Sequence, residues 1–291
     1  MIPIWINQPH FKKTIIHVTI CTLLFGFGHR VIADAIHDAA LDGNLPAIKN
    51  ILAAQPDAVN ARDEKGLQPL HLAVIKGHDD VVRVLLDSGA DIEAKNADGY
   101  TSLQLSAIMG KKETAKLLLE RKAKIDAQDN DQMTALHWAV GYDNKEIVEL
   151  LLANHANVNA VNKLGNTPLH GAALKPDSII VKLLLDNGAL VNAKNKDVST
   201  ALALACVKGD SKTIEVLLAG KADVNAADND GDTPLHQAAY NNNVEAIRLL
   251  IKNGASVSAR DNRGVSPLSL AVSRGKVEAE KVLRESGATD P

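Results

Sequence analysis

The sequence repeats itself every 33 residues, and this period limits the chain to a small group of architectures. The segment GLQPLHLA at residues 66–73 returns in related form at six further equal steps. Those later copies start at residues 99, 132, 165, 198, 231 and 264, with no insertion between them. An earlier copy begins near Ile36 and has one extra residue between 53 and 61. Because a unit this short cannot bury its apolar face alone, the period predicts repeats that stack into one elongated array.

Each copy carries the signals for two short helices followed by a turn. A Thr or Ser stands where its side chain can cap the first helix, and Pro follows at the first helical position in four copies. Gly recurs where each helix should end. Stretches rich in Asp, Asn and Gly, such as residues 222–231, favour a projecting turn. The expected capping residues are Thr101, Thr134, Thr167, Thr200, Thr233 and Ser266.

The pattern resembles the ankyrin repeat, a 33-residue unit with the signature T-P-L-H-x-A. This chain has TPLHGA at 167–172 and TPLHQA at 233–238. The resemblance covers residues 34 to about 289. It implies an all-α repeat solenoid of stacked helix-turn-helix repeats with projecting β-hairpin turns. The expected units are an N-terminal capping repeat at 34–65, repeats at 66–98, 99–131, 132–164, 165–197, 198–230 and 231–263, and a C-terminal capping repeat at 264–291.

Three residues depart from the pattern. Gln132 and Val198 stand where the other copies have Gly, and a β-branched residue is costly if that position needs a positive φ. We therefore expect the turn around Val198 to depart from the geometry of the other turns. We also expect its backbone amides, near residues 195–200, to exchange fastest. Pro176 replaces the Gly between the two helices of its repeat and is expected to reshape that link.

Residues 1–33 form a different kind of segment. Two lysines precede an apolar run at residues 14–28, and small residues follow it, which is the order of a secretory signal peptide. Cleavage is expected after Ala33 or Ala35, and we favour Ala33. An uncleaved membrane anchor is the alternative, but the run is shorter than the about 20 apolar residues that a spanning helix needs. The sequence thus predicts an exported, bacterial protein that is periplasmic or secreted and has no membrane association after cleavage.

Composition narrows the function further. The net charge of −3 argues against a nucleic-acid partner, because such proteins need a basic face for the phosphates. Beyond the N-terminal segment only one cysteine remains, Cys206, so no internal disulfide can form. We expect Cys206 to be a buried space-filler.

Histidine, which often binds metals or takes part in catalysis, recurs here at one position of the repeat. One column contains His37, His71, His137, His170 and His236. Metal ligands must converge within about 2.0–2.1 Å of one ion, which residues one repeat apart cannot do. The resemblance implies instead that each histidine bonds to the backbone of the adjoining turn. His78 and His155 are isolated and are expected to face solvent.

The recurring Asp and Asn residues of the turns are expected to stabilise those turns. Asp228 begins a stretch that resembles half of a calcium loop, but residue 239, where the loop needs Glu, is Ala. No Gly-rich phosphate loop, nucleophile elbow or CxxC motif occurs. The sequence therefore predicts no catalytic residues, no cofactor and no metal.

The surface is what remains to carry a function. The resemblance implies that partners contact the turn tips and the exposed end of the first helix. Aromatic residues and Met are enriched in binding hot spots, and several occur in or beside these columns. The predicted partner-binding residues are Tyr100, Met109, Met133, Trp138, Tyr142, Leu164, Lys175, Lys208 and Tyr240. The favoured cluster is Tyr100, Met133, Trp138 and Tyr142; the alternative is that Trp138 only packs on Leu105.

These observations favour a non-catalytic, monomeric scaffold that binds another protein on its concave face. One alternative is a bacterial effector that binds a host protein. An enzyme or small-molecule binder is the other, but no cluster of titratable residues lies outside the repeat columns. The fold supplies a surface and leaves the identity of the partner to its variable positions.

Overall fold

The computed structural model describes residues 32–289. Within that range the chain forms sixteen α-helices and one 3-10 helix, with no strand. The predicted signal segment, residues 1–33, lies outside the described residues except for Ile32 and Ala33, which begin the first helix. The expected all-α repeat solenoid is confirmed.

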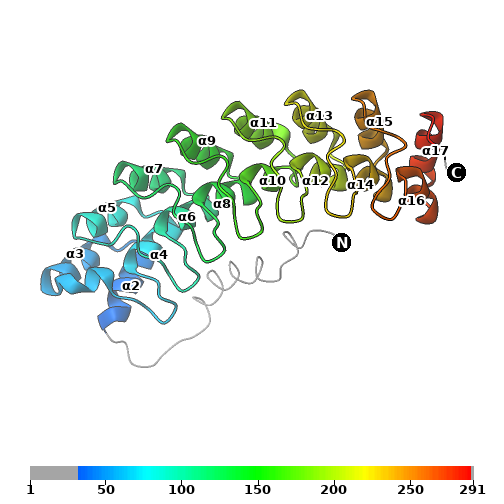
Figure 1. The fold of residues 1–291 in the computed structure, drawn as a ribbon. Helices are drawn as coiled ribbons and strands as arrows, with labels where there is room; N and C mark the ends of the chain where they lie inside the picture. Colours follow the sequence, from blue (N-terminus) through cyan, green and yellow to red (C-terminus); the bar gives the residue numbers. More distant parts are fainter. Residues whose placement is uncertain (1–31, 290–291) are drawn as a thin grey trace.

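The helices lie in two rows that follow a common arch, and the connecting turns project from the concave side (Figure 1). The first row contains α2 (Ile32–Asp42), α4 (Pro69–Lys76), α6 (Ser102–Ile108), α8 (Ala135–Gly141), α10 (Pro168–Ala172), α12 (Ala201–Lys208), α14 (Pro234–Tyr240) and α16 (Pro267–Ser273). The second row contains α3 (Leu45–Ala54), α5 (Asp79–Asp87), α7 (Lys112–Glu120), α9 (Lys145–Ala153), α11 (Ser178–Asp186), α13 (Ser211–Ala219), α15 (Val244–Lys252) and α17 (Val277–Glu285). The 3-10 helix η1 (Pro56–Asn60) takes up the extra residue of the first copy.

The core is one continuous layer of Leu, Val, Ile and Ala. The Leu that follows the cap in each full repeat is at most 2% exposed, from Leu70 to Leu268. The Ala three residues later, such as Ala73, is fully buried and leaves room for the next helix to approach. Cys206 is also fully buried, as expected of a space-filler. Thin layers of this kind are filled without large rings, which explains why aromatic residues make up only 3% of the sequence.

Four of the six expected capping residues cap their helices as the sequence predicts, whereas the hydroxyls of Thr167 and Thr233 lie 2.9 Å from the Nδ1 atoms of His170 and His236. The Oγ of Ser266 accepts a hydrogen bond from the backbone N–H of Ser269 at 3.0 Å, and the hydroxyls of Thr101, Thr134 and Thr200 accept equivalent bonds. These bonds satisfy amide groups that have no partner within the helix. Four first-row helices begin with Pro: α4, α10, α14 and α16.

The projecting turns are closed by an Asp or Asn side chain rather than by a β-ladder. In the turn before α4, the Oδ1 of Asp63 accepts hydrogen bonds from the backbone N–H groups of Lys65 and Leu67 at 2.9 and 2.7 Å. The same arrangement recurs in the other turns, so the expected turn-stabilising role is confirmed. Neighbouring turns are joined by backbone bonds, for example from Ala97 N to Lys65 O at 3.1 Å.

The turn around Val198 corrects one expectation. Val198 adopts a φ of 59°, and Gln132 a φ of 60°, so the Gly column does require the left-handed region. Nevertheless the backbone N–H of Val198 donates to Asn195 O at 2.9 Å, the bond that Gly165 makes to Asn162 O at 2.8 Å. The expected departure from the common geometry was therefore wrong. The turn keeps its shape because the side chain of Asn195 holds it, and Val198 carries the backbone strain.

Pro176 reshapes its link, as expected. The equivalent residues Gly77, Asp143 and Gly209 all have positive φ, between 61° and 80°. The proline ring holds φ near −65°, so it cannot take that conformation. Helix α10 accordingly ends at Ala172 after five residues, whereas α12 in the next repeat has eight.

The last described repeat carries charges where the others stack apolar side chains. Glu280 takes the column of the fully buried Val82, and its carboxylate pairs with Nε of Arg284 at 3.0 Å. An ion pair suits a solvent-facing end better than an interface between repeats.

Candidate functional site

Three aromatic rings from two adjacent repeats form one connected cluster on the concave side. Tyr100 lies in the turn before α6, Trp138 on α8, and Tyr142 at the end of α8. The rings of Tyr100 and Trp138 meet edge to face with centroids 5.4 Å apart. Those of Trp138 and Tyr142 stack at 6.2 Å with an interplanar angle of 28°. Both separations fall in the range of favourable aromatic pairs.

A buried carboxylate fixes the central ring. The indole N–H of Trp138 donates to Oδ2 of Asp129 at 2.8 Å, while Oδ1 of Asp129 accepts from the backbone N–H groups of Asp131 and Met133. Burial raises the pKa of Asp129, and these three hydrogen bonds oppose that rise. Sequence reasoning assigned Asp129 only to its turn and missed this bond. The signal was available, because Asp129 lies in the turn directly before the repeat that carries the only tryptophan after the N-terminal segment.

The predicted residues differ in how far they reach solvent. Met133 and Trp138 are 4% and 6% exposed, so they support the surface from beneath. Tyr100 and Tyr142 are half-buried and present the accessible part of the cluster. Met109 is also half-buried and occupies the column of Tyr142 in the preceding repeat. Burial raises the pKa of Tyr142 to about 12, so its hydroxyl is neutral at physiological pH. We call Tyr100, Met109, Trp138 and Tyr142 the aromatic patch.

The two predicted lysines, Lys175 and Lys208, lie on the side of the aromatic patch that faces the C-terminal repeats. The Nζ of Lys175 donates a hydrogen bond to the backbone carbonyl of Gly141, which ends α8 one residue before Tyr142. Burial lowers the pKa of Lys175, the charge of Lys208 lowers it further, and Asp143 opposes both. The structure therefore places Lys175 beside the aromatic patch, with Lys208 near enough to repel it.

Leu164 and Tyr240 lie apart from the patch. Leu164 is 52% exposed at the tip of the turn between α9 and α10. Tyr240 is 41% exposed at the end of α14, and the guanidinium of Arg274 lies 5.1 Å from its ring centroid. They remain predicted contacts at other points of the concave face.

The histidine column serves structure, as the resemblance implies. The Nδ1 of His137 accepts a hydrogen bond from the backbone N–H of Thr134, and its Nε2 lies 3.1 Å from Asn166 O in the next turn. With an acceptor opposite Nε2, the proton is assigned to Nε2 and the ring is neutral. Burial lowers the pKa of His71 and His137 to about 4. Among residues 32–289, no group of His, Cys, Asp or Glu could hold a metal ion.

The two isolated histidines have different surroundings. His155 is exposed, as expected. His78 is not a free surface residue, because its Nε2 lies 3.1 Å from Leu41 O on the preceding helix pair. Asn144 and Asn243 occupy the same column and donate to Ala107 O and Cys206 O. The expectation for His78 was therefore wrong, and the comparison with its asparagine equivalents would have corrected it.

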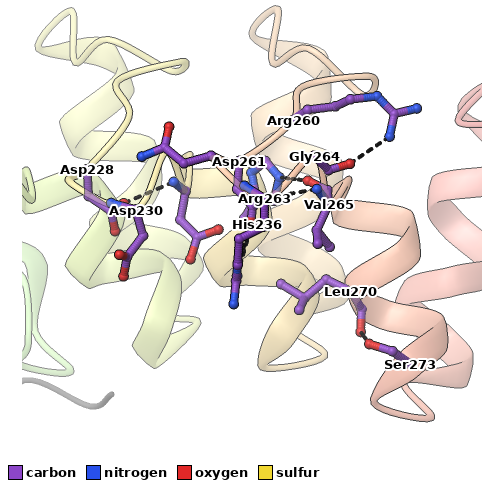
Figure 2. A network of polar contacts seen from close by, with 12 residues as sticks. Asp228, Asp230, His236, Arg260, Asp261, Arg263, Gly264, Val265, Leu270 and Ser273 are labelled. Carbon is purple, nitrogen blue, oxygen red and sulfur yellow. Dashed lines mark hydrogen bonds and ion pairs between the residues drawn. The ribbon is translucent and has the colours of Figure 1, made fainter.

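The acidic turns at the C-terminal end form a polar network rather than a cation site (Figure 2). The Oδ1 of Asp228 accepts from the backbone N–H of Asp230, and Oδ2 of Asp261 pairs with Arg263 at 2.6 Å. Burial alone would raise the pKa of Asp261, but bonds from Val265 and Arg263 bring it below its usual value. These carboxylates stabilise their own turns through hydrogen bonds and an ion pair.

Taken together, the fold and the patch define a repeat protein with a continuous concave face (Figure 1). The ankyrin-repeat family model matches residues 17–96, 36–129, 93–162, 122–195 and 202–290. The chain belongs to the ankyrin-repeat family.

Curated relatives match over about two repeats. Human protein phosphatase 1 regulatory subunit 27 is 43% identical over 60 residues, which cover 21% of this chain and 38% of that protein. Bovine ankyrin repeat domain-containing protein 49 is 43% identical over 56 residues, 19% of this chain and 24% of the relative. Palmitoyltransferase akr1 of Aspergillus oryzae is 35% identical over 63 residues, which cover 22% of this chain and 8% of that protein. In each case the chain spans well under half the length of the relative.

No helix in residues 32–289 is both long and apolar enough to cross a membrane.

Proposed function

We propose that this chain is a non-catalytic scaffold that binds another protein on its concave face, with the aromatic patch as the centre of contact. The observation that carries the proposal is the connected series Tyr100–Trp138–Tyr142, held by Asp129 and partly open to solvent. Hot spots are typically rigid aromatic residues surrounded by contacts that exclude water. The matched regulatory subunit of a phosphatase supports a binding role for repeats of this kind.

The test is capture of partners by the purified chain and by the double variant Tyr142→Ala/Met109→Ala. Both residues are half-buried and contribute accessible side chain, so their loss should leave the fold intact. Ile179→Ala is the matched control, because Ile179 is 44% exposed on α11 in the second row. We expect the double variant to lose the partner and the control to retain it. Retention by the double variant at unchanged melting temperature would place the binding site elsewhere.

We further propose that the protein is bacterial, exported, and acts as a periplasmic or secreted monomer. The support is the sequence order of residues 1–33, with two lysines, an apolar run and small residues. Fractionation of the native cell, with sizing of the chain found in each fraction, tests this. A full-length chain in the cytosol would contradict export. Recovery inside a host cell would favour the effector alternative.

A further inference from the structure

The aromatic patch has a different charge on each of its two sides. Asp98 and Asp131 lie at exposed turn tips on the side of Tyr100. The pKa of Tyr100 is raised most by burial, then by the charge of Asp129, and further by the charges of Asp98 and Asp131. Lys175 and Lys208 lie on the other side, beyond Tyr142. A ligand that crosses the patch therefore meets carboxylates at one end, and at the other end two ammonium groups with the single carboxylate of Asp143.

Lys175 lies near two other charges: Asp143, which raises the pKa of its ammonium group, and Lys208, which lowers it by less. Lys175 is tied to Gly141 O, which fixes its ammonium group at the edge of the patch. Lys208 is exposed at the end of α12, and no acid among the described residues lies within ion-pair distance of either lysine. Since each charge raises the electrostatic energy of the other, a carboxylate placed between them would relieve the repulsion as well as form two ion pairs.

We propose that the partner segment recognised here is an acidic peptide with an aromatic or large aliphatic anchor. This rests on the proposed binding function and names its ligand class. The anchor contacts Tyr100, Met109 and Tyr142, and carboxylates on one side of it contact Lys175 and Lys208. Neighbouring helices lie about 8–10 Å apart, and an extended chain advances about 3.3–3.6 Å per residue. Acidic residues about three positions apart in the peptide therefore match the two lysines.

The opposite side of the patch argues against a broad anionic ligand. A flat anionic membrane or a nucleic-acid backbone would bring negative charge to Asp98 and Asp131 as well as to the lysines. A peptide avoids this repulsion because its acidic residues can lie on one side of the anchor only. The charge pattern thus favours a peptide of defined direction.

The experiment selects peptides from a randomised 12-residue display library on the purified full chain. We expect the selected peptides to carry Trp, Phe, Leu or Ile followed or preceded on one side by Asp or Glu. Their affinity should fall at least tenfold for Lys175→Glu/Lys208→Glu. It should stay within twofold for Lys212→Glu/Lys252→Glu, which makes the same charge change at exposed sites on α13 and α15. High salt should weaken binding to the unaltered chain.

The other outcomes distinguish a wrong ligand class from a wrong binding function. Peptides that need Tyr142 but are neutral or basic, or that bind the Lys175→Glu/Lys208→Glu variant equally well, would overturn the acidic ligand and leave the proposed function standing. Selected peptides insensitive to Tyr142→Ala and Met109→Ala would overturn both. Phosphatidylglycerol vesicles form a second arm. Binding to them that is lost in Lys175→Glu/Lys208→Glu would replace the peptide by an anionic membrane.

Discussion

At the scale of single residues, the hydrogen bond between Trp138 and Asp129 both stabilises the fold and fixes the central ring of the aromatic patch. Trp138→Phe keeps an aromatic ring but removes the donor to the buried Oδ2 of Asp129. We expect a loss of about 1–3 kcal/mol in the free energy of unfolding, the cost of an unsatisfied buried acceptor. Urea denaturation measures it. The double variant Trp138→Phe/Asp129→Asn should recover part of the loss, because Asn162 and Asn195 hold the equivalent turns with an amide.

Val198 is the residue at which a substitution should stabilise the protein. Its φ of 59° costs a β-branched side chain about 1–2 kcal/mol, whereas glycine accepts it and loses about 0.5–1 kcal/mol in chain entropy. Val198→Gly should therefore raise the free energy of unfolding by about 1 kcal/mol. The reverse change at the equivalent site, Gly165→Val, should destabilise, because its added Cβ would lie 2.9 Å from Lys196 N. A destabilised Val198→Gly variant would show that the strain is absent.

At the scale of elements, the same strain should appear as local opening of a turn. We expect backbone amides of residues 195–199 to exchange faster than those of the equivalent turn at 162–166, which has Gly165 in the strained position. Hydrogen exchange followed by mass spectrometry compares the two turns in one sample. Val198→Gly should remove the difference. Equal exchange rates in the two turns of the unaltered chain would contradict this expectation.

The elements also show which features the sequence could and could not predict. The period of 33 predicts the helix pairs, caps and turns, because each column has a local backbone role. The reshaped link at Pro176 was predictable for the same reason. Contacts between columns were not predictable: the bond from Trp138 to Asp129 and the placement of His78 against Leu41 O depend on which side chains stacking brings together.

At the scale of the whole molecule, the histidine column should make stability depend on pH. His71 and His137 have a pKa of about 4 when folded, against 6.5 when exposed. The unfolded chain then binds more protons between these values, so the free energy of unfolding falls as pH drops from 6.5 toward 4. The loss between pH 7 and pH 5 is about 2 kcal/mol for each of the two. The raised pKa values of Asp129 and Asp232 partly oppose the trend at its acidic end.

His137→Gln is the matched test of this pH dependence. Gln104 occupies the same column and makes the same contacts, with Oε1 accepting from Thr101 N and Nε2 donating to Met133 O. The variant should fold, and its loss of stability between pH 7 and pH 5 should be smaller by about 2 kcal/mol. Urea denaturation at the two pH values gives the difference. An unchanged loss would mean that His137 is already protonated in the folded state at pH 5.

The array as a whole presents two long faces, and the proposed function assigns the partner to the concave one (Figure 1). Binding elsewhere, for example on the second-row helices, would leave the aromatic patch without a function. The measurement that separates these cases is photo-crosslinking in the native cell with benzoylphenylalanine at position 109 or at position 179. We predict a covalent adduct with another protein from position 109 and none from position 179. An adduct from position 179 alone would contradict the account.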